Sequence, residues 1–550
     1  MKHIALAFLS ALSIMPSASA SATLSVDGIA IACPTALDRR WVHILYDFKK
    51  DEQVATMTNI VATAKAHGYT GVILGSSCGL GMLHLWDETR RSRLMTVKKA
   101  CDEAKLEIAV GVWSIGYAKE SFFPIDHNLS AAAPVFDTRY RVADGKCIYK
   151  PVPSRELLDV PSRVHSPRRT NDVADMVVPV KPRRSYRLTV RAKSPKGKFA
   201  NWPICVSVQR TDCKDDYIQT RPFYVKADGT EQTFTLDFPS LAEKELRIIC
   251  RGYNRTFPSH ADILSMKLEE TDPQLAIRRH GTPITVRNVK TGRIYDEGRD
   301  YAEIPRAKTV WPGPWIKQRF AIIPLKGGAI KDGDNLSVDC YCSFPVYGKY
   351  ASACMAAPEL EPIMDASAAE IARVLKPRLW LLSYDEVRSG GGCRDCLRIG
   401  DMAHIYAEFV KKSMKIVRRH VPNAEFMIWN DMVDPFYMVD NGENAGLYSS
   451  MKGVWDLLPP DIGIGYWTYR TREKGMRFFS GQKRPLLVCA YYDEKVLNHS
   501  LEWADLALRT PGTVGIVYCT WGCNWKLLGE FGDMARQKAE AAHRQAIRRP

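Results

Sequence analysis

Ile462-Gly-Ile-Gly-Tyr-Trp467, Leu486-Leu-Val-Cys-Ala-Tyr491 and Val514-Gly-Ile-Val-Tyr-Cys-Thr520 are short apolar runs separated by amphipathic stretches. The same alternation begins earlier, with Arg378-Leu-Trp-Leu-Leu-Ser-Tyr384 and Glu425-Phe-Met-Ile-Trp429. Buried strands that alternate with amphipathic helices are typical of βα units in a parallel sheet. Residues 346–550 therefore predict five successive βα units.

The N-terminal part of the chain carries the same pattern. Trp41–Tyr46, Thr70–Leu74 and Ile108–Trp113 are predicted strands, and residues 51–67 and 88–105 are predicted helices between them. Three strands in residues 38–125 and five in residues 346–550 make eight. The sequence thus predicts an α/β fold, a (β/α)8 barrel, in which catalytic groups lie where strands end.

The central region interrupts this pattern. Residues 137–272 show β-type alternation with turn signals, as in Ser185-Tyr-Arg-Leu-Thr-Val-Arg191. We expect an inserted, jelly-roll-like β-sandwich after the third barrel strand. Val177-Val-Pro-Val-Lys-Pro182 resembles carbohydrate-binding modules of this kind, and a structural spacer is the alternative. Residues 273–345 are predicted to be a β-rich connector that returns the chain to the barrel.

The first twenty residues are typical of a secretory signal. Lys2 and His3 supply charge, Ile4–Met15 is apolar, and Ala18-Ser19-Ala20 is a small-residue cleavage site. No later stretch reaches the roughly 18 apolar residues of a spanning helix. We expect an exported protein without a membrane span, secreted or periplasmic.

The net charge of +16 raises the possibility of a nucleic-acid partner. The basic residues are scattered, however, and no nucleic-acid-binding motif accompanies them. We therefore expect no nucleic-acid partner. A basic exported protein is better suited to acidic glycans or to an anionic surface.

Fifteen cysteines remain after the signal segment. In an oxidising compartment some of them are expected to form disulfides. Cys393-Arg-Asp-Cys396 has half of the spacing of a zinc site, and Cys340, Cys342 and Cys354 are possible partners. The pattern favours a disulfide or free thiols over structural zinc, and we predict no metal in the active site.

Carboxylates and tryptophans stand where the last five predicted strands end. Aromatic faces stack on sugar rings, and carboxylates accept hydrogen bonds from sugar hydroxyls. Their shared position predicts a sugar pocket, although each alone has a structural explanation. The residues at these strand ends are Asp385, Glu386, Trp429, Asp431, Trp467, Tyr491, Asp493, Glu494 and Trp521.

The adjacent carboxyl groups of Asp385 and Glu386 suit the acid catalysis that glycosidic cleavage needs. Glycosidic cleavage needs a carboxylic acid that stays protonated near neutral pH, and a neighbouring carboxylate raises a carboxyl pKa by repulsion. Adjacent residues on a strand point to opposite faces, so both can approach one substrate only where the strand ends. The alternative is a solvated pair that caps the next helix.

This arrangement resembles the site of glycoside hydrolase family 20, the β-N-acetylhexosaminidases, or of a relative such as family 123. The resemblance covers only the barrel, chiefly residues 378–525. It implies Glu386 as general acid/base, and Asp385 and Tyr491 as contacts of the substrate's 2-acetamido group. It also implies that Asp493 binds ring hydroxyls, and that the pocket is walled by Trp429, Trp467 and Trp521.

The sequence departs from the family pattern at three places. Leu381-Leu-Ser-Tyr384 replaces the family's His-X-Gly-Gly, Tyr46-Asp47 stands where strand one should end in arginine, and Cys523 replaces a carboxylate. These departures affect the expected contacts with sugar hydroxyls, so the resemblance does not identify the exact sugar.

Three functions remain open from the sequence. The first is a retaining hydrolase in which the substrate's acetamido oxygen is the nucleophile. The second is a double-displacement glycosidase with Glu386 as acid/base and Asp493 or Glu494 as nucleophile, about 5–5.5 Å away. The third is a non-catalytic carbohydrate-binding protein with a degenerate barrel. All three have a glycan or oligosaccharide partner, and the absence of P-loop, Rossmann and metal-triad motifs predicts no cofactor.

Overall fold

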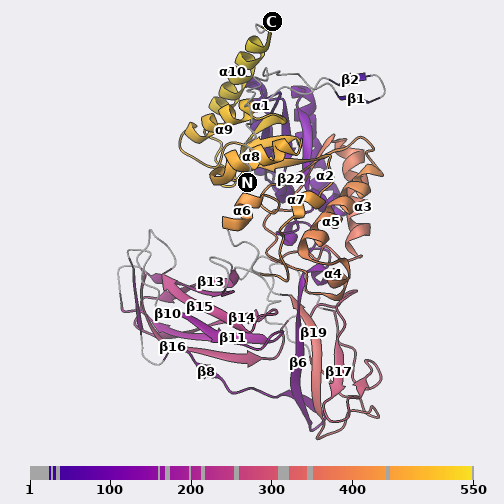
Figure 1. The fold of residues 1–550 in the computed structure, drawn as a ribbon, viewed down its shortest axis with the longest axis vertical. Coiled ribbons are helices and arrows are strands. Elements are labelled where there is room, and N and C mark those ends of the chain that lie inside the picture. The colour runs from indigo at the N-terminus through magenta and orange to yellow at the C-terminus, as the bar shows by residue number, and fades with distance from the viewer. Residues whose placement is uncertain are drawn as a thin grey trace, which may run out of the picture.

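The computed structural model describes residues 24–26, 29–31, 37–158, 162–166, 174–196, 200–211, 217–252, 259–274, 276–306, 321–343, 351–440 and 446–547. The expected signal segment, residues 1–20, lies outside these ranges. Figure 1 shows a helix-covered barrel at one end of the molecule and antiparallel sheets at the other. Strands β1 (Leu24–Val26) and β2 (Ile29–Ile31) form a separate antiparallel pair.

Eight parallel strands close into the expected barrel. Each strand is short and almost wholly buried, which agrees with the apolar runs of the sequence. In chain order the strands are β3 (Arg39–Ile44), β4 (Gly71–Leu74), β5 (Glu107–Val112), β20 (Leu379–Leu382), β22 (Glu425–Trp429), β24 (Ile462–Tyr466), β25 (Leu486–Cys489) and β26 (Thr513–Cys519).

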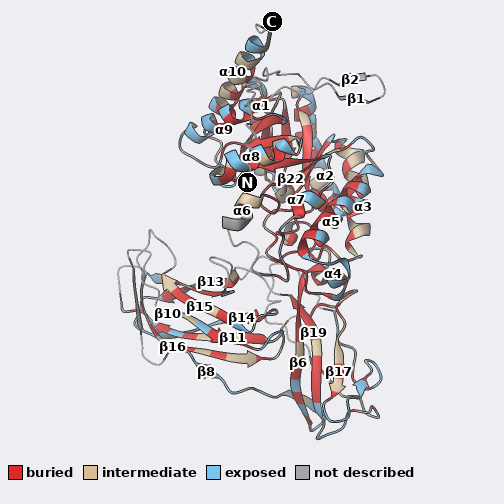
Figure 2. Ribbon diagram, in the orientation of Figure 1, coloured by how far each residue is buried: buried red, intermediate tan, exposed pale blue. Residues whose placement is uncertain are grey.

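Helices surround the barrel, and their buried faces are apolar (Figure 2). The side chains of Asp87 and Asp401 cap two of them by accepting hydrogen bonds from the backbone N–H groups of Arg90 and His404. The helices are α1 (Asp51–Ala66), α2 (Glu88–Ala104), α3 (Leu360–Leu375), α4 (Arg394–Ile399), α5 (Met402–Arg418), α6 (Pro435–Asp440), α7 (Val454–Leu457), α8 (Arg472–Gly481), α9 (Asn498–Arg509) and α10 (Leu528–Ile547). Among the described helices, none combines the length and the apolar character needed to cross a bilayer.

The barrel interior is a packed core rather than a channel. Side chains of alternate strand positions fill it, among them Trp41, Ile73, Leu381 and Met427. Above these residues the interior layer ends at Trp429, which is 3% exposed. The barrel therefore has a solid floor on which a pocket can rest.

Two antiparallel sheets pack face to face over a second hydrophobic core. One sheet has the order β10-β15-β12-β13, and the other has the order β14-β11-β16-β8, with β9 also paired to β16. The strands are β8 (Arg155–Glu156), β9 (Ser162–Ser166), β10 (Ala174–Pro179), β11 (Ser185–Lys193), β12 (Asn201–Gln209), β13 (Tyr217–Lys226), β14 (Glu231–Pro239), β15 (Glu245–Gly252) and β16 (Ser259–Thr271).

A further antiparallel sheet lies beside these two, with the order β18-β17-β19-β6-β7. It joins segments far apart in the sequence, because β6 pairs with β19. The strands are β6 (Ala132–Ala143), β7 (Lys146–Tyr149), β17 (Thr285–Asn288), β18 (Ile294–Tyr295) and β19 (Asn335–Ser343). All these antiparallel strands fall, in chain order, between β5 and β20, which pair with each other in the barrel.

Candidate active site

A pocket of about 370 Å³ lies at the carboxyl ends of the barrel strands. This volume is in the range of small-molecule sites. The last residue of β22 and the segments that follow the other seven strands contribute to it, so the pocket is a product of barrel closure. Its lining residues are Leu45, Ser76, Ser77, Tyr117, Lys119, Asp385, Glu386, Trp429, Trp467, Tyr492 and Trp521.

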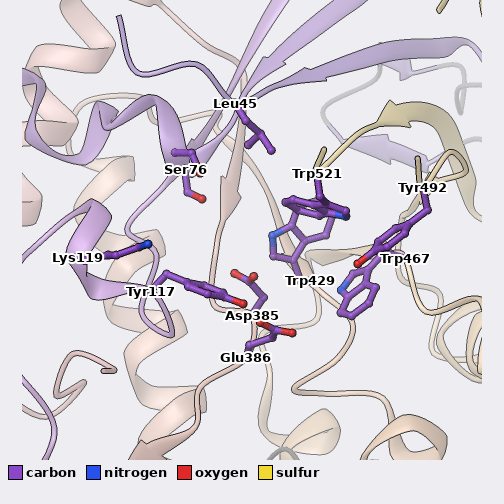
Figure 3. A pocket seen from close by; sticks show the side chains of 11 residues that line it. Leu45, Ser76, Tyr117, Lys119, Asp385, Glu386, Trp429, Trp467, Tyr492 and Trp521 are labelled. Atoms are coloured by element: carbon purple, nitrogen blue, oxygen red, sulfur yellow. The ribbon is translucent and has the colours of Figure 1, made fainter. Parts of the chain in front are cut away.

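Asp385 and Glu386 both line this pocket although they are neighbours in the chain. Strand β20 ends at Leu382, and Glu386 has a φ of 49°, in the left-handed region. This conformation is uncommon for a non-glycine residue and breaks the alternation of a strand. In Figure 3 the two carboxylates lie between Tyr117 and the aromatic rings of the opposite wall.

The loop after β5 packs directly on this turn. A Cβ atom at Gly116 would lie 2.1 Å from the carbonyl oxygen of Asp385 and 2.5 Å from that of Glu386. No side chain fits at such distances. Gly116 therefore lets the β5 loop, with Tyr117, approach the carboxylate pair closely.

The two carboxylates have different electrostatic surroundings. Burial raises the pKa of Asp385 from 3.8 to about 6, against the opposing influence of Arg388. The sequence pointed to repulsion within the pair, but the cause that raises this pKa is burial. Glu386 instead forms an ion pair with Arg388, whose side chain is 12% exposed and lies over the ring of Tyr117.

Asp431 contacts the backbone of the carboxylate pair and does not line the pocket. One of its carboxylate oxygens accepts a hydrogen bond from the backbone N–H of Glu386 at 2.8 Å. The other accepts a longer one from the Trp467 indole at 3.4 Å. Asp431 is 2% exposed, so it fixes Glu386 and Trp467 relative to each other from within the protein.

Aromatic rings form the wall opposite Tyr117 (Figure 3). Trp467 and Tyr492 are stacked, with ring centroids 6.2 Å apart and an interplanar angle of 14°. Trp429 and Trp521 meet edge to face at 6.2 Å. Tyr492 and Trp521 are 51% and 39% exposed, so two large apolar faces border open solvent at the pocket.

His43 lies in the buried part of β3 and contacts two of the tryptophans. Its ring packs edge-on against Trp429 and Trp521, and Nδ1 lies 3.2 Å from the Sγ atom of Cys519. Burial lowers the pKa of His43 to about 4, which keeps the ring uncharged at neutral pH. His43 thus supports Trp429 and Trp521 as an uncharged ring packed against both.

Tyr491 is fully buried and is absent from the pocket lining. Its hydroxyl donates to the backbone carbonyl of Glu494 at 2.8 Å and accepts a hydrogen bond from the Asn524 amide at 2.8 Å. The ring stacks on Tyr518, with centroids 4.2 Å apart. Its neighbour Tyr492 is the tyrosine that lines the pocket.

Asp493 and Glu494 are also outside the lining. Asp493 accepts hydrogen bonds from the backbone N–H groups of Trp521 and Gly522, at 2.8 and 2.9 Å, and from the Thr520 hydroxyl. Its carboxylate thereby organises the loop that carries Trp521. Glu494 pairs with His499.

Five of the sequence-derived site residues line the pocket: Asp385, Glu386, Trp429, Trp467 and Trp521. The sequence analysis missed Tyr117, Lys119, Ser76, Arg388 and His43. Four of these follow β4, β5 or β20 in loops and single-turn 3-10 helices, which are too short for periodicity to carry a signal. His43 lies inside the predicted strand Trp41–Tyr46, where the pattern assigns a core position, so strand-end reasoning could not have found it either.

The sequence matches no protein-family model and no curated protein. Solved structures that resemble parts of it include a β-N-acetylhexosaminidase of Bacteroides fragilis, at 14% identity over 35% of this chain and 42% of that chain, with a TM-score of 0.25. The N-acetyl-β-hexosaminidase of Streptomyces plicatus has 13% identity over 35% and 40%, with a TM-score of 0.23. A carbohydrate-binding module of a Cellvibrio mixtus lichenase has 9% identity over 25% and 99%, with a TM-score of 0.14. This chain covers less than half of either hexosaminidase. At these scores the function must be argued from the site itself.

Proposed function

We propose that the protein is an exported glycoside hydrolase that cleaves N-acetylhexosamine-containing glycans with retention of configuration. The observation that carries this proposal is the position of Asp385 and Glu386 together at one side of a pocket whose other side is aromatic. Aromatic faces hold sugar rings, and paired carboxyl groups supply acid/base chemistry.

In the proposed reaction the acetamido oxygen of the substrate attacks the anomeric carbon. Glu386 transfers its proton to the glycosidic oxygen as the bond to the leaving group breaks, and a cyclic oxazolinium forms. Glu386 then takes a proton from water as the water oxygen attacks the anomeric carbon and reopens the ring. Arg388 stabilises the carboxylate of Glu386 that exists between these two proton transfers.

Asp385 supports the internal nucleophile in this scheme. As a carboxylate it accepts a hydrogen bond from the acetamido N–H and stabilises the positive charge that develops on this nitrogen. We assign the remaining contact with the acetamido group to Tyr492 rather than Tyr491, because Tyr492 lines the pocket and Tyr491 does not.

The surroundings of Asp493 and Glu494 argue against double displacement. A nucleophilic carboxylate must point at the anomeric carbon, in the same cavity as the acid/base residue. Asp493 uses both oxygens to hold the Trp521 loop, and Glu494 pairs with His499 outside the pocket lining. These contacts favour the acetamido group as nucleophile, with Asp493 in a positioning role.

Turnover of aryl N-acetyl-β-hexosaminides by Glu386→Gln tests the proposal, with Glu494→Gln as the matched control. We expect Glu386→Gln to lower kcat by the 10²–10⁴-fold typical of general acid/base residues while the variant still folds. Glu494→Gln should retain activity, because this side chain lies outside the pocket lining. Activity lost in Glu494→Gln and kept in Glu386→Gln would reverse the assignment, and a wild-type protein that binds sugars without releasing any would be a carbohydrate-binding protein.

A further inference from the structure

Three buried cysteines form a cluster outside the pocket. Cys354 lies in the segment before α3, Cys393 lies immediately before α4, and Cys396 lies within α4. They are 3%, 1% and 2% exposed. Among the described residues, this is the one group of three metal-ligating side chains whose ligand atoms lie within 4.8 Å of one another.

The three sulfur atoms form a nearly equilateral triangle. The Sγ–Sγ distances are 3.6 Å from Cys354 to Cys393, 3.6 Å from Cys354 to Cys396 and 3.5 Å from Cys393 to Cys396. With the Zn–S bond of about 2.3 Å, tetrahedral coordination places sulfur atoms about 3.8 Å apart, and a planar three-sulfur site places them about 4.0 Å apart. The triangle is therefore nearer to one face of a tetrahedron.

A buried arginine supplies a second, independent observation. Arg279 is 8% exposed, and its Nη1 atom lies 3.7 Å from the Sγ atom of Cys393. Its other contacts are the neutral carbonyl oxygens of His280 and Ser130, and among the described residues no carboxylate lies within ion-pair distance of it. A buried guanidinium is costly without a negative partner. Thiolate sulfur atoms in the cluster would supply the negative partner of Arg279.

The charges balance if a divalent ion is bound. Three thiolates and one Zn²⁺ have a net charge of −1, and Arg279 contributes +1. A disulfide between two of the cysteines would leave one thiol, which offers Arg279 no charge unless it ionises. The charge count and the sulfur–sulfur distances thus both fit a bound divalent ion.

We propose that Cys354, Cys393 and Cys396 bind one zinc ion as thiolates, as three of its ligands, with Arg279 as the neighbouring counter-charge. Thiolate ligands select zinc and other soft metals. The proposed ion fastens the segment before α3 to the β20–α4 loop. This loop also carries Arg388, the ion-pair partner of Glu386, so the ion steadies one side of the pocket without belonging to it.

The metal content of the full chain, purified without chelators after growth with added zinc, tests this proposal. We expect about one zinc per chain in the wild type and a large loss in Cys354→Ser. Cys340→Ser is the matched control, because Cys340 and Cys342 are a buried pair with sulfur atoms 3.8 Å apart and belong to no described three-ligand group. Equal zinc in the wild type and in Cys354→Ser would overturn the assignment, as would a wild type without zinc.

Cobalt substitution of the wild type gives an answer that does not depend on a variant that folds. After chelation and exchange, we expect the thiolate-to-cobalt charge-transfer absorption and the intense visible bands of a tetrahedral site. Weak bands typical of octahedral cobalt would contradict a three-thiolate site. Peptide mapping that finds Cys393 joined to Cys354 or Cys396 in the native protein would replace the metal by a disulfide.

Discussion

Asp385 and Glu386 are adjacent in the sequence, but their carboxyl groups have different electrostatic surroundings. Asp385 is held in a poorly hydrated environment that raises its pKa to about 6, while Glu386 is paired with Arg388 and positioned through its backbone by Asp431. Carboxyl groups whose environments differ in this way can take different roles in one reaction. The proposed roles assign orientation of the nucleophile to Asp385 and proton transfer to Glu386.

The pH dependence of kcat/KM tests the role of Asp385. If this residue acts as a carboxylate, activity should rise as the pH passes upward through about 6, because Asp385 then loses its proton. Asp385→Asn should have low activity and should lack this acidic limb. The opposite result, a wild-type activity that falls as the pH rises through about 6, would make Asp385 the proton donor and exchange the two roles.

The three tryptophans of the aromatic wall could be predicted because they stand at or just after the ends of regular strands. Trp429, Trp467 and Trp521 follow apolar runs whose length and spacing identify the barrel edge. Tyr117 and Arg388 lie in loops, where position depends on contacts such as those of Gly116 with the Asp385 backbone. Tyr491 satisfied the strand-end pattern, but its hydroxyl is hydrogen-bonded to the Glu494 carbonyl and the Asn524 amide, and its neighbour Tyr492 lines the pocket instead.

At the scale of elements, the site depends on how two loops meet. The β20 turn presents both carboxylates because Glu386 adopts a left-handed conformation, and the β5 loop can cover this turn because residue 116 has no side chain. Backbone strain of this kind persists only where surrounding structure holds it in place. The close packing of the β5 loop supplies this restraint.

Gly116→Ala should therefore displace the β20 turn. We expect a loss of kcat/KM of about 10²-fold, because displacements near 1 Å at a reacting centre have effects of this size. The free energy of unfolding should fall by about 1–3 kcal/mol, as in other overpacked sites. Gly481→Ala is the control, because a Cβ atom there meets nothing within 4 Å. Full activity in Gly116→Ala would show that the turn does not position the carboxylates.

At the scale of the whole molecule, the alternation of helices and strands predicted the barrel well, since most of its eight strands are short, largely apolar runs; β3 (Arg39–Ile44) is an exception, with Arg39, Arg40 and His43. The central region was harder to divide. The expected sandwich boundary at residue 137 falls within β6, whose pairing with β19 depends on residues two hundred positions apart, beyond the reach of local patterns. We propose that the sandwich module comprises β8 to β16, after the β6–β7 hairpin, and that it binds glycan.

Deletion of residues 151–272 with a short linker tests this module. The cut ends lie near each other, because the Tyr149 hydroxyl donates to the Glu270 carbonyl at 2.9 Å. Turnover of small aryl substrates should be largely unchanged, since no described residue of the sandwich lines the pocket. Binding to polymeric glycan should weaken. A collapse of small-substrate turnover in a folded variant would assign the sandwich to the active site instead.

In the proposed reaction the substrate supplies its own nucleophile with the help of Asp385. The most direct measurement compares kcat/KM for two aryl glycosides that differ only in bearing a 2-acetamido or a 2-hydroxyl group, in the wild type and in Asp385→Asn. We predict a strong preference of the wild type for the 2-acetamido substrate, and a loss of about 10²-fold or more on this substrate in Asp385→Asn. Equal wild-type activity on both substrates, together with azide rescue of Asp493→Ala, would contradict the account and establish double displacement.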